Sequence, residues 1–191
     1  MDESKKTDSE ISRGCRRNDP RAWRGLVEKY TPMVYRIAVR MLINDRDAED
    51  VSQEVFLRVH RYISGYDPTR PLAPWLARIT YNSCLKRLPR IQQIARNETP
   101  LEDYDPVDDR QSSNPAYEVG AADTRRQVSA ALDRLSAQDR ALLVLRYREG
   151  FTDSEIAEST RMPVGSVKSR LHRARGKLRK MLAPLFKEIT T

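Results

Sequence analysis

The spacing of apolar residues constrains this chain more than any other feature. Apolar side chains recur three and four positions apart in runs that begin at Trp23, Val34, Ala48 and Trp75, and the pattern returns from Val128. Such spacing gives each helix one apolar stripe that packs against neighbouring helices. No stretch alternates apolar and polar residues as a half-buried strand does, and no internal repeat is visible. The sequence therefore predicts an all-α fold.

Charge and proline content divide the chain into two helical domains and a linker. Residues 89–123 carry three basic and eight acidic side chains, a net charge of −5, and include four prolines. Proline-rich acidic segments with little apolar periodicity are typical of flexible linkers. We therefore expect an N-terminal tail over residues 1–14, a helical domain over 15–88, an acidic flexible linker over 89–123 and a second helical domain over 124–188. The acidic residues of the linker either keep a flexible tether solvated or mimic a nucleic-acid backbone. The candidates for such mimicry are Asp103, Asp105, Asp108 and Asp109.

The second domain contains a predicted helix-turn-helix. Thr152 and Glu155 have the spacing of a capping box, residues 159–162 break that helix, and Pro163 suits the first turn of the next one. In the second helix a buried stripe is expected, made by Val164, Val167, Leu171, Ala174 and Leu178. Residues 163–180 hold seven basic residues and no acidic one. A helix of this kind fits the major groove of DNA, and the net charge of +8 also favours a polyanionic partner.

Several other classes of protein are excluded by composition. The chain has two cysteines, Cys15 and Cys84, and two histidines, whereas a structural zinc site needs about four such ligands. We expect both cysteines to fill the core of a reduced cytoplasmic protein. No apolar run approaches the roughly 20 residues that span a bilayer, and the first ten residues are polar, so membrane insertion and a secretory signal are not expected. Phosphate-binding loops and nucleophile–base pairs are also missing from the sequence, which argues against an enzyme, a cofactor or a small-molecule substrate.

Three motifs in order resemble one known family. Residues 162–175 (MPVGSVKSRLHRAR) strongly resemble the region-four signature of extracytoplasmic-function sigma factors of the sigma-70 family. Residues 47–58 (DAEDVSQEVFLR) are similar to the region-two helix that docks on the polymerase. The stretch from Trp75 to Ile79, followed by Asn82, resembles the helix beside the −10 element. The resemblance covers roughly residues 15–188, and it implies region two over 15–88 and region four over 124–188.

The resemblance implies a protein that joins core RNA polymerase and directs it to a class of promoters. Its partners would be the β′ clamp coiled coil, the β flap, promoter DNA and an anti-sigma factor. The implied polymerase contacts are Asp47, Asp50, Gln53, Glu54 and Arg58. The implied contacts that recognise and melt the −10 element are Tyr66, Arg78, Asn82, Lys86 and Arg87. The implied −35 contacts are Ser166, Lys168, Ser169, Arg170, His172, Arg173 and Arg175, with Arg170 and Arg175 expected on phosphate or in local pairs.

The chain departs from the family pattern at three positions. Asp67 follows Tyr66 where relatives often have arginine, which leaves the preferred base of the −10 pocket open. Lys86 stands where aspartate is common and adds positive charge near the DNA. Arg161 occupies a turn position that is often glycine, so we expect a strained turn. Trp75 is expected to belong to the core rather than to stack on a base.

Two other functions compete with a sigma factor. A stand-alone helix-turn-helix regulator would bind DNA as a dimer without polymerase, but it would need a ligand or receiver domain, and the first domain has no α/β pattern. A metal-dependent nuclease would need carboxylates clustered around a bound phosphate. The acidic residues here lie on the docking-like helix or in the linker, which disfavours that reading.

Overall fold

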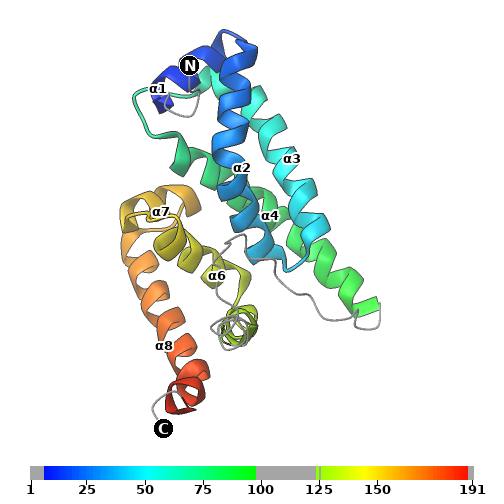
Figure 1. Cartoon of the computed structure of the whole chain (residues 1–191), viewed down its shortest axis with the longest axis vertical. Coiled ribbons are helices and arrows are strands. Elements are labelled where there is room, and N and C mark those ends of the chain that lie inside the picture. The colour runs from blue at the N-terminus through cyan, green and yellow to red at the C-terminus, as the bar shows by residue number, and fades with distance from the viewer. Residues whose placement is uncertain (1–6, 98–123, 125, 189–191) are drawn as a thin grey trace, which may run out of the picture.

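The computed structural model describes residues 7–97, 124 and 126–188, and its two domains are helical (Figure 1). The first domain contains α1 (Asp8–Arg16), α2 (Pro20–Leu42), α3 (Asp45–Tyr62), the 3₁₀ turn η2 (Ile63–Gly65) and α4 (Leu72–Asn97). The second contains helical residues 126–133, α6 (Ala137–Leu143), the π-helical turn η3 (Val144–Arg148), α7 (Asp153–Thr160) and α8 (Val164–Glu188). The described residues include no strand, which confirms the predicted all-α class. The acidic part of the predicted linker, residues 98–123, lies outside them.

The core of the first domain lies where α2, α3 and α4 pack on one another. The fully buried side chains there include Leu26, Ile37, Val51 and Leu76. They come from the predicted stripes. None of the described helices is long and apolar enough to cross a bilayer. As expected, Cys15 and Cys84 are buried in this core.

The first domain begins earlier than predicted, because α1 is part of it. Thr7 and Glu10 form a capping box, in which the Glu10 N–H donates to the Thr7 hydroxyl and the Glu10 carboxylate accepts from the Thr7 N–H. Ile11 is buried, and a Cβ added to Gly14 would lie 2.4 Å from the Cβ of Ala22 on α2. The predicted tail is therefore wrong for residues 8–14, since this close approach and an apolar contact hold α1 on α2.

The predicted start of the linker at residue 89 is also wrong, because α4 continues to Asn97. Pro89 removes one helical N–H and crowds the carbonyl of Leu85, yet it lies inside the helix. Leu85, Leu88 and Ile91 still pack against the core on both sides of the proline. This continuing apolar stripe keeps the chain helical where proline alone indicated a break.

The two domains touch, a feature that the linker composition did not indicate. Helix α7 packs on α4, and α6 and η3 pack on α2. The buried apolar residues of both domains form one continuous cluster. Helix α8 packs on α6 and α7, and its C-terminal half extends away from the first domain (Figure 1). The helix-turn-helix is therefore docked by its first helix, while its second helix points outward.

The turn between α7 and α8 carries the strain expected at Arg161. This residue has φ 56° and ψ 32°, a left-handed conformation, and its N–H donates to the Ala157 carbonyl. A side chain in this conformation brings Cβ close to the following carbonyl, at a cost of roughly 1–2 kcal/mol that glycine avoids.

Arg161→Gly should therefore raise the free energy of unfolding by about 1 kcal/mol, part of the relieved strain being offset by the greater freedom of glycine in the unfolded chain. Urea denaturation followed by circular dichroism measures this change. Arg161→Ala is the control, because it removes the guanidinium but keeps Cβ, and it should leave stability nearly unchanged. Equal stabilisation by both variants would show that charge, not backbone strain, matters at this position.

Candidate nucleic-acid interface

The N-terminal half of α8 presents one polar face to solvent. Val167, Leu171 and Ala174 are buried as predicted. The predicted DNA contacts on the other faces are exposed, namely Ser166, Lys168, Ser169, His172, Arg173 and Arg175. Val164 was expected in the buried stripe, but its side chain is 38% exposed because it is the first residue of the helix. The phase of α8 therefore leaves a row of polar and basic side chains exposed to a ligand.

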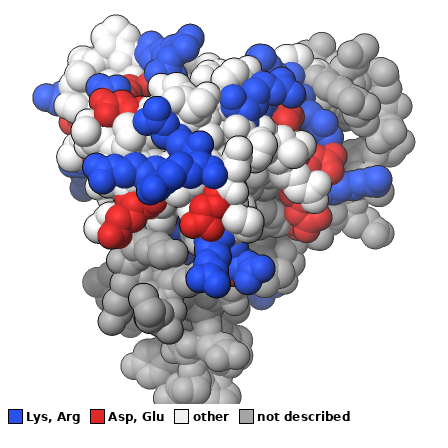
Figure 2. All heavy atoms as spheres, turned by 90° about the horizontal axis from the view of Figure 1, so that it is seen from above, with Lys and Arg blue, Asp and Glu red and all other residues white. Residues whose placement is uncertain are grey.

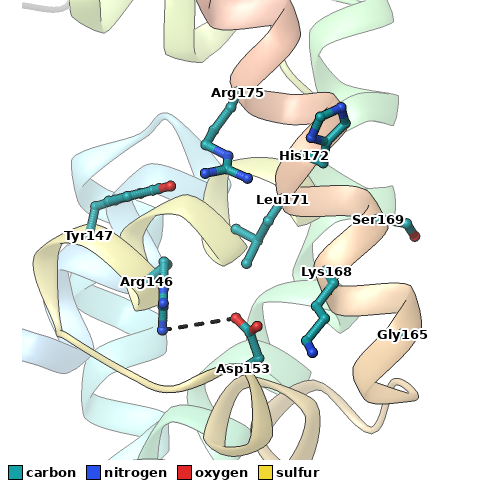
Figure 3. A pocket seen from close by; sticks show the side chains of 9 residues that line it. All are labelled: Arg146, Tyr147, Asp153, Gly165, Lys168, Ser169, Leu171, His172 and Arg175. Atoms are coloured by element: carbon teal, nitrogen blue, oxygen red, sulfur yellow. Dashed lines mark ion pairs between the residues drawn. The ribbon is translucent and has the colours of Figure 1, made fainter.

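A concavity of about 770 Å³ separates this face of α8 from η3 (Figure 3). Arg146 and Tyr147 of η3 form one wall, and Lys168 and Arg175 of α8 lie across from them, with Leu171 between (Figure 3). Arg146 donates to the Phe151 carbonyl at 2.9 Å and lies 3.9 Å from the carboxylate of Asp153. The sequence did not single out Arg146 or Tyr147, which lie six and five residues before Thr152 of the capping box. Together these groups make a basic groove that suits a phosphate backbone.

Arg170 takes the local role that the sequence left open for it. Its guanidinium donates to the Gln138 side-chain oxygen at 2.6 Å and lies 3.7 Å from the Asp139 carboxylate on α6. The side chain is half-buried, unlike those of Lys168 and Arg173. Arg170 therefore fixes α8 on α6 and does not point into the groove.

The predicted polymerase-docking residues share one side of α3. Asp50 and Gln53 are exposed, while Asp47, Glu54 and Arg58 are half-buried. Glu54 accepts from Arg58 at 2.5 Å, and Arg87 of α4 bridges Asp47 and Asp50 at 2.8 Å each. Leu57, which no sequence motif indicated, is 70% exposed. It lies seven residues after Asp50 and three after Glu54, so these three side chains occupy the same helical face.

The loop between η2 and α4 (residues 66–71), here called the −10 loop after the contact predicted for Tyr66, is folded onto the protein. Tyr66 is only 7% exposed; its ring lies 4.7 Å from that of Trp75, and its hydroxyl donates to the Arg70 carbonyl. Burial, together with the nearby Asp8 carboxylate, raises the pKa of Tyr66 to about 12. Trp75 packs against the core, as expected. The Asp67 carboxylate accepts from the Thr69 N–H at 3.0 Å and from its hydroxyl at 2.8 Å, so this departure from the family shapes the turn.

The other predicted −10 contacts lie along α4. Arg78 and Asn82 are half-buried, and Lys86 is exposed. Arg87 is engaged by the two carboxylates of α3. The structure thus brings together four of the five predicted residues on one helix, while Tyr66 lies in the core next to it.

Asp8 ties α1 to the start of α4, a link that the sequence did not reveal. Its carboxylate accepts from the Lys29 ammonium at 2.8 Å, from the Tyr30 hydroxyl at 2.5 Å and from the Leu72 N–H at 2.9 Å. Burial raises the pKa of Asp8, but the hydrogen bonds from Lys29, Tyr30 and Leu72 outweigh it and hold the pKa below its ordinary value. The C-terminal end of the −10 loop is therefore anchored by a charged group.

Basic side chains also gather on the end of the molecule where α1 meets α2. Seen from above, this face shows broad groups of Lys and Arg with smaller acidic areas between them (Figure 2). The exposed arginines of α1 and of the first part of α2, with the short turn between them, are Arg13, Arg16, Arg17, Arg21 and Arg24. Within the described ranges no three His, Cys, Asp or Glu side chains are grouped so as to hold a metal ion.

Comparison with known proteins agrees with this arrangement. The family model for sigma-70 region 2 matches residues 26–94, and the model for sigma-70 region 4 matches residues 125–178. The chain is 30% identical over 177 residues to the ECF RNA polymerase sigma factor SigW of Bacillus subtilis, covering 89% of this chain and 94% of that protein. It is 38% identical over 162 residues to the ECF RNA polymerase sigma factor SigE of Mycolicibacterium smegmatis, covering 85% of this chain and 62% of that longer protein.

Solved structures share the fold. A sigma factor RpoE in complex with the anti-sigma factor NepR from Bartonella quintana has a TM-score of 0.66 at 21% identity, covering 84% of this chain and 96% of that one. CnrH in complex with the cytosolic domain of CnrY has a TM-score of 0.65 at 22% identity, covering 94% and 99%. Identities this low show the fold alone, whereas the sequence matches show the family. The chain belongs to the extracytoplasmic-function family of RNA polymerase sigma factors.

Proposed function

We propose that this chain joins core RNA polymerase in the cytoplasm and directs it to promoters with defined −35 and −10 elements, without catalysing a reaction itself. One observation carries this proposal. The basic face of α8 is exposed on a helix whose opposite face is buried, and the α3 face with Asp50 and Glu54 lies on the other domain. A chain with two separate binding helices is suited to bridging a protein partner and DNA.

In this proposal α8 reads the −35 element from the major groove. Lys168 and Arg173 donate to guanine edges, while Ser169 and His172 contact bases or phosphate. Ser166 at the helix start and Arg175 across the groove contact phosphates, and Arg146 and Tyr147 of η3 extend the same backbone contact. Each phosphate neutralised makes the affinity fall with salt.

The first domain would hold the polymerase and the −10 element. Asp47, Asp50, Gln53, Glu54 and Arg58 would contact the β′ clamp coiled coil, and Leu57 would add an apolar anchor at the centre of that face. Tyr66, Arg78, Asn82, Lys86 and Arg87 would contact the melted −10 strand, with the base-unstacking cost of a few kcal/mol offset by these contacts. The second domain would also meet the β flap. One structural relative above, the sigma factor RpoE, is a complex with an anti-sigma factor, and we propose an anti-sigma factor for this chain too.

Run-off transcription with purified core polymerase on genomic fragments tests the proposal. We expect discrete transcripts that need both the core enzyme and this chain, and their start sites define the promoter. A chain that binds specific DNA tightly without polymerase and supports no initiation would instead be a dimeric helix-turn-helix regulator.

Leu57→Lys tests the proposed docking surface without disturbing the fold. The leucine is exposed, so the substitution should leave stability within about 0.5 kcal/mol, yet it places a charge at the centre of the proposed polymerase contact. We expect at least a tenfold loss of core binding, about 1.4 kcal/mol, in a competition assay. Val27→Lys is the matched control, because Val27 is also an exposed apolar residue but lies on α2, outside that face. Equal losses from both variants would remove Leu57 from the docking surface.

A further inference from the structure

Arginines crowd the end of the molecule where α1 turns into α2, on the face that Figure 2 shows from above. Residues 13–24 carry five arginines and one aspartate, a net charge of +4. All five arginines are exposed. We call this group the arginine surface, and its members are Arg13, Arg16, Arg17, Arg21 and Arg24.

The fold brings the two halves of the arginine surface together. Helices α1 and α2 pack so closely that a Cβ added to Gly14 would lie 2.4 Å from the Cβ of Ala22. In the turn between them Asn18 has a left-handed conformation with φ 56°, and the Asp19 N–H donates to the Gly14 carbonyl at 3.1 Å. The backbone that carries the arginines is therefore fixed by helix packing and by a hydrogen-bonded turn.

Neighbouring acids do not neutralise this surface. In the part of the chain that the structure describes, none of the five arginines forms an ion pair with a carboxylate. Asp19 is the N-cap of α2, and its carboxylate accepts from the Arg21 backbone N–H at 2.9 Å. A concavity of about 340 Å³ is lined by Arg13, Arg16 and Arg17. Grouped like charges repel one another, and an unpaired basic cluster of this kind is suited to a polyanionic ligand.

The arginine surface is continuous with the proposed −10 contacts. Helix α1 packs on η2, and the Asp8 carboxylate in its first turn accepts from the Leu72 N–H at 2.9 Å, where the −10 loop ends. Arg16 lies at the other end of the same helix, about 12 Å away at a rise of about 1.5 Å per residue. A strand of DNA advances about 3.4 Å per nucleotide in B-form geometry, so about four nucleotides cover this distance.

Resting on the proposed function, we propose that the arginine surface binds the phosphate backbone of the single strand that runs on from the −10 element. Guanidinium groups donate paired hydrogen bonds to phosphate oxygens, and such contacts hold a strand without reading its bases. The ligand is a single strand rather than a duplex, because the neighbouring −10 contacts are made to melted DNA. The surface thereby keeps the opened strand on the first domain, whatever the sequence of that strand.

Binding of the holoenzyme to single-stranded oligonucleotides tests this surface. A reference oligonucleotide carries only the −10 element of a promoter defined by run-off transcription, and two others extend it by about four nucleotides at the 5′ or the 3′ end. Extension at one end should strengthen binding at least about fivefold, the combined effect of several modest surface charge contacts. A different sequence in the extension should give the same gain, because phosphate contacts carry no sequence information.

Neutralising three of the arginines should abolish this gain. The triple variant combines Arg13→Gln, Arg16→Gln and Arg17→Gln. It should bind the extended and the reference oligonucleotides equally tightly. For the extended oligonucleotide, the slope of log affinity against log salt should become shallower by about 2, at about 0.7 per phosphate contact on a single strand. Lysine at the same three positions keeps the charge and should retain most of the gain.

A matched control makes the same change of charge elsewhere and should keep the full gain. It replaces three exposed basic residues of the second domain, with Arg126→Gln, Arg134→Gln and Lys177→Gln. Because the residues of the arginine surface are exposed, thermal unfolding followed by circular dichroism should show the triple variant to be as stable as the wild-type chain.

Three results would overturn the arginine surface: no gain from extension at either end, a gain that survives in the triple variant, or an equal loss in the matched control. A gain that appears only after a complementary strand is annealed to the extension would overturn the single strand as the ligand and assign the surface to duplex DNA. If the wild-type holoenzyme does not bind even the reference oligonucleotide, the proposed function itself fails, which is distinct from losing the gain on extension alone.

Discussion

Arg140→Leu should lower the free energy of unfolding by about 3–5 kcal/mol, the range for removing one side of a buried charged network. Arg140 is only 5% exposed and donates to four carbonyls, on Arg40, Met41, Asp133 and Leu135. Leucine fills much of the space but donates nothing, so buried acceptors lose their partner. Two of these carbonyls belong to the end of α2, and the variant should therefore loosen the domain contact as well.

Chemical denaturation followed by circular dichroism measures the effect. Arg134→Leu is the matched control, because Arg134 is exposed in the same segment and its replacement should change stability by less than about 0.5 kcal/mol. If Arg140→Leu lowered the free energy of unfolding by less than about 1 kcal/mol, the four carbonyls would have found other donors, and Arg140 would not stabilise the domain contact.

Arg173→Ala should weaken holoenzyme binding to a cognate promoter by about 1–3 kcal/mol, or roughly 5- to 150-fold, if this side chain reads a base. Arg173 is exposed on the free side of α8, and truncating it leaves Val167, Leu171 and Ala174 in place, so the fold should not change. The variant should lose its discrimination between bases at one base pair of the −35 element and keep it at the others, because a base contact carries sequence information and a phosphate contact does not.

Binding to a set of −35 duplexes with single substitutions checks this prediction. Lys177→Ala serves as the control, because Lys177 is an exposed basic residue further along α8, outside the predicted contact set, and its loss should weaken binding slightly and equally for all sequences. An Arg173→Ala effect that is uniform across the set would assign this arginine to phosphate.

The local parts of the fold could be predicted from the sequence, since they depend on residues close in the chain. Thr152 caps α7 as its spacing from Glu155 predicted, and Asn44, whose side chain accepts from the Asp47 N–H at 2.9 Å, caps α3 in the same local way. The tetrapeptide Thr-Asp-Ser-Glu occurs at Thr7 and again at Thr152, and it forms a capping box at both places. The signal for α1 was therefore present in the sequence, but without a long apolar run after it the segment looked like a tail.

The parts that could not be predicted depend on residues far apart in the chain. Arg36 donates two hydrogen bonds to the Glu149 carboxylate, at 2.7 and 2.9 Å, although the two residues are 113 positions apart. In the sequence each is indistinguishable from an ordinary charged surface residue. Tyr66 likewise packs against the ring of Trp75, nine positions further along the chain, at a centroid distance of 4.7 Å. Helical phase predicted which side of α8 is exposed, whereas it contained no information about which side of α4 is covered by α7 of the second domain.

Permanganate reactivity of promoter thymines reports whether this chain opens promoter DNA, because permanganate detects unpaired thymines in the −10 element. On a promoter defined by run-off transcription, we predict permanganate-reactive thymines at −10, together with protection of the −35 element from nuclease cleavage, when core polymerase and this chain are both present. Core polymerase alone and the chain alone should leave the −10 thymines unreactive. Reactivity that does not depend on this chain, or protection without any opening of the −10 element in the complete mixture, would contradict its assignment as the promoter-recognition subunit.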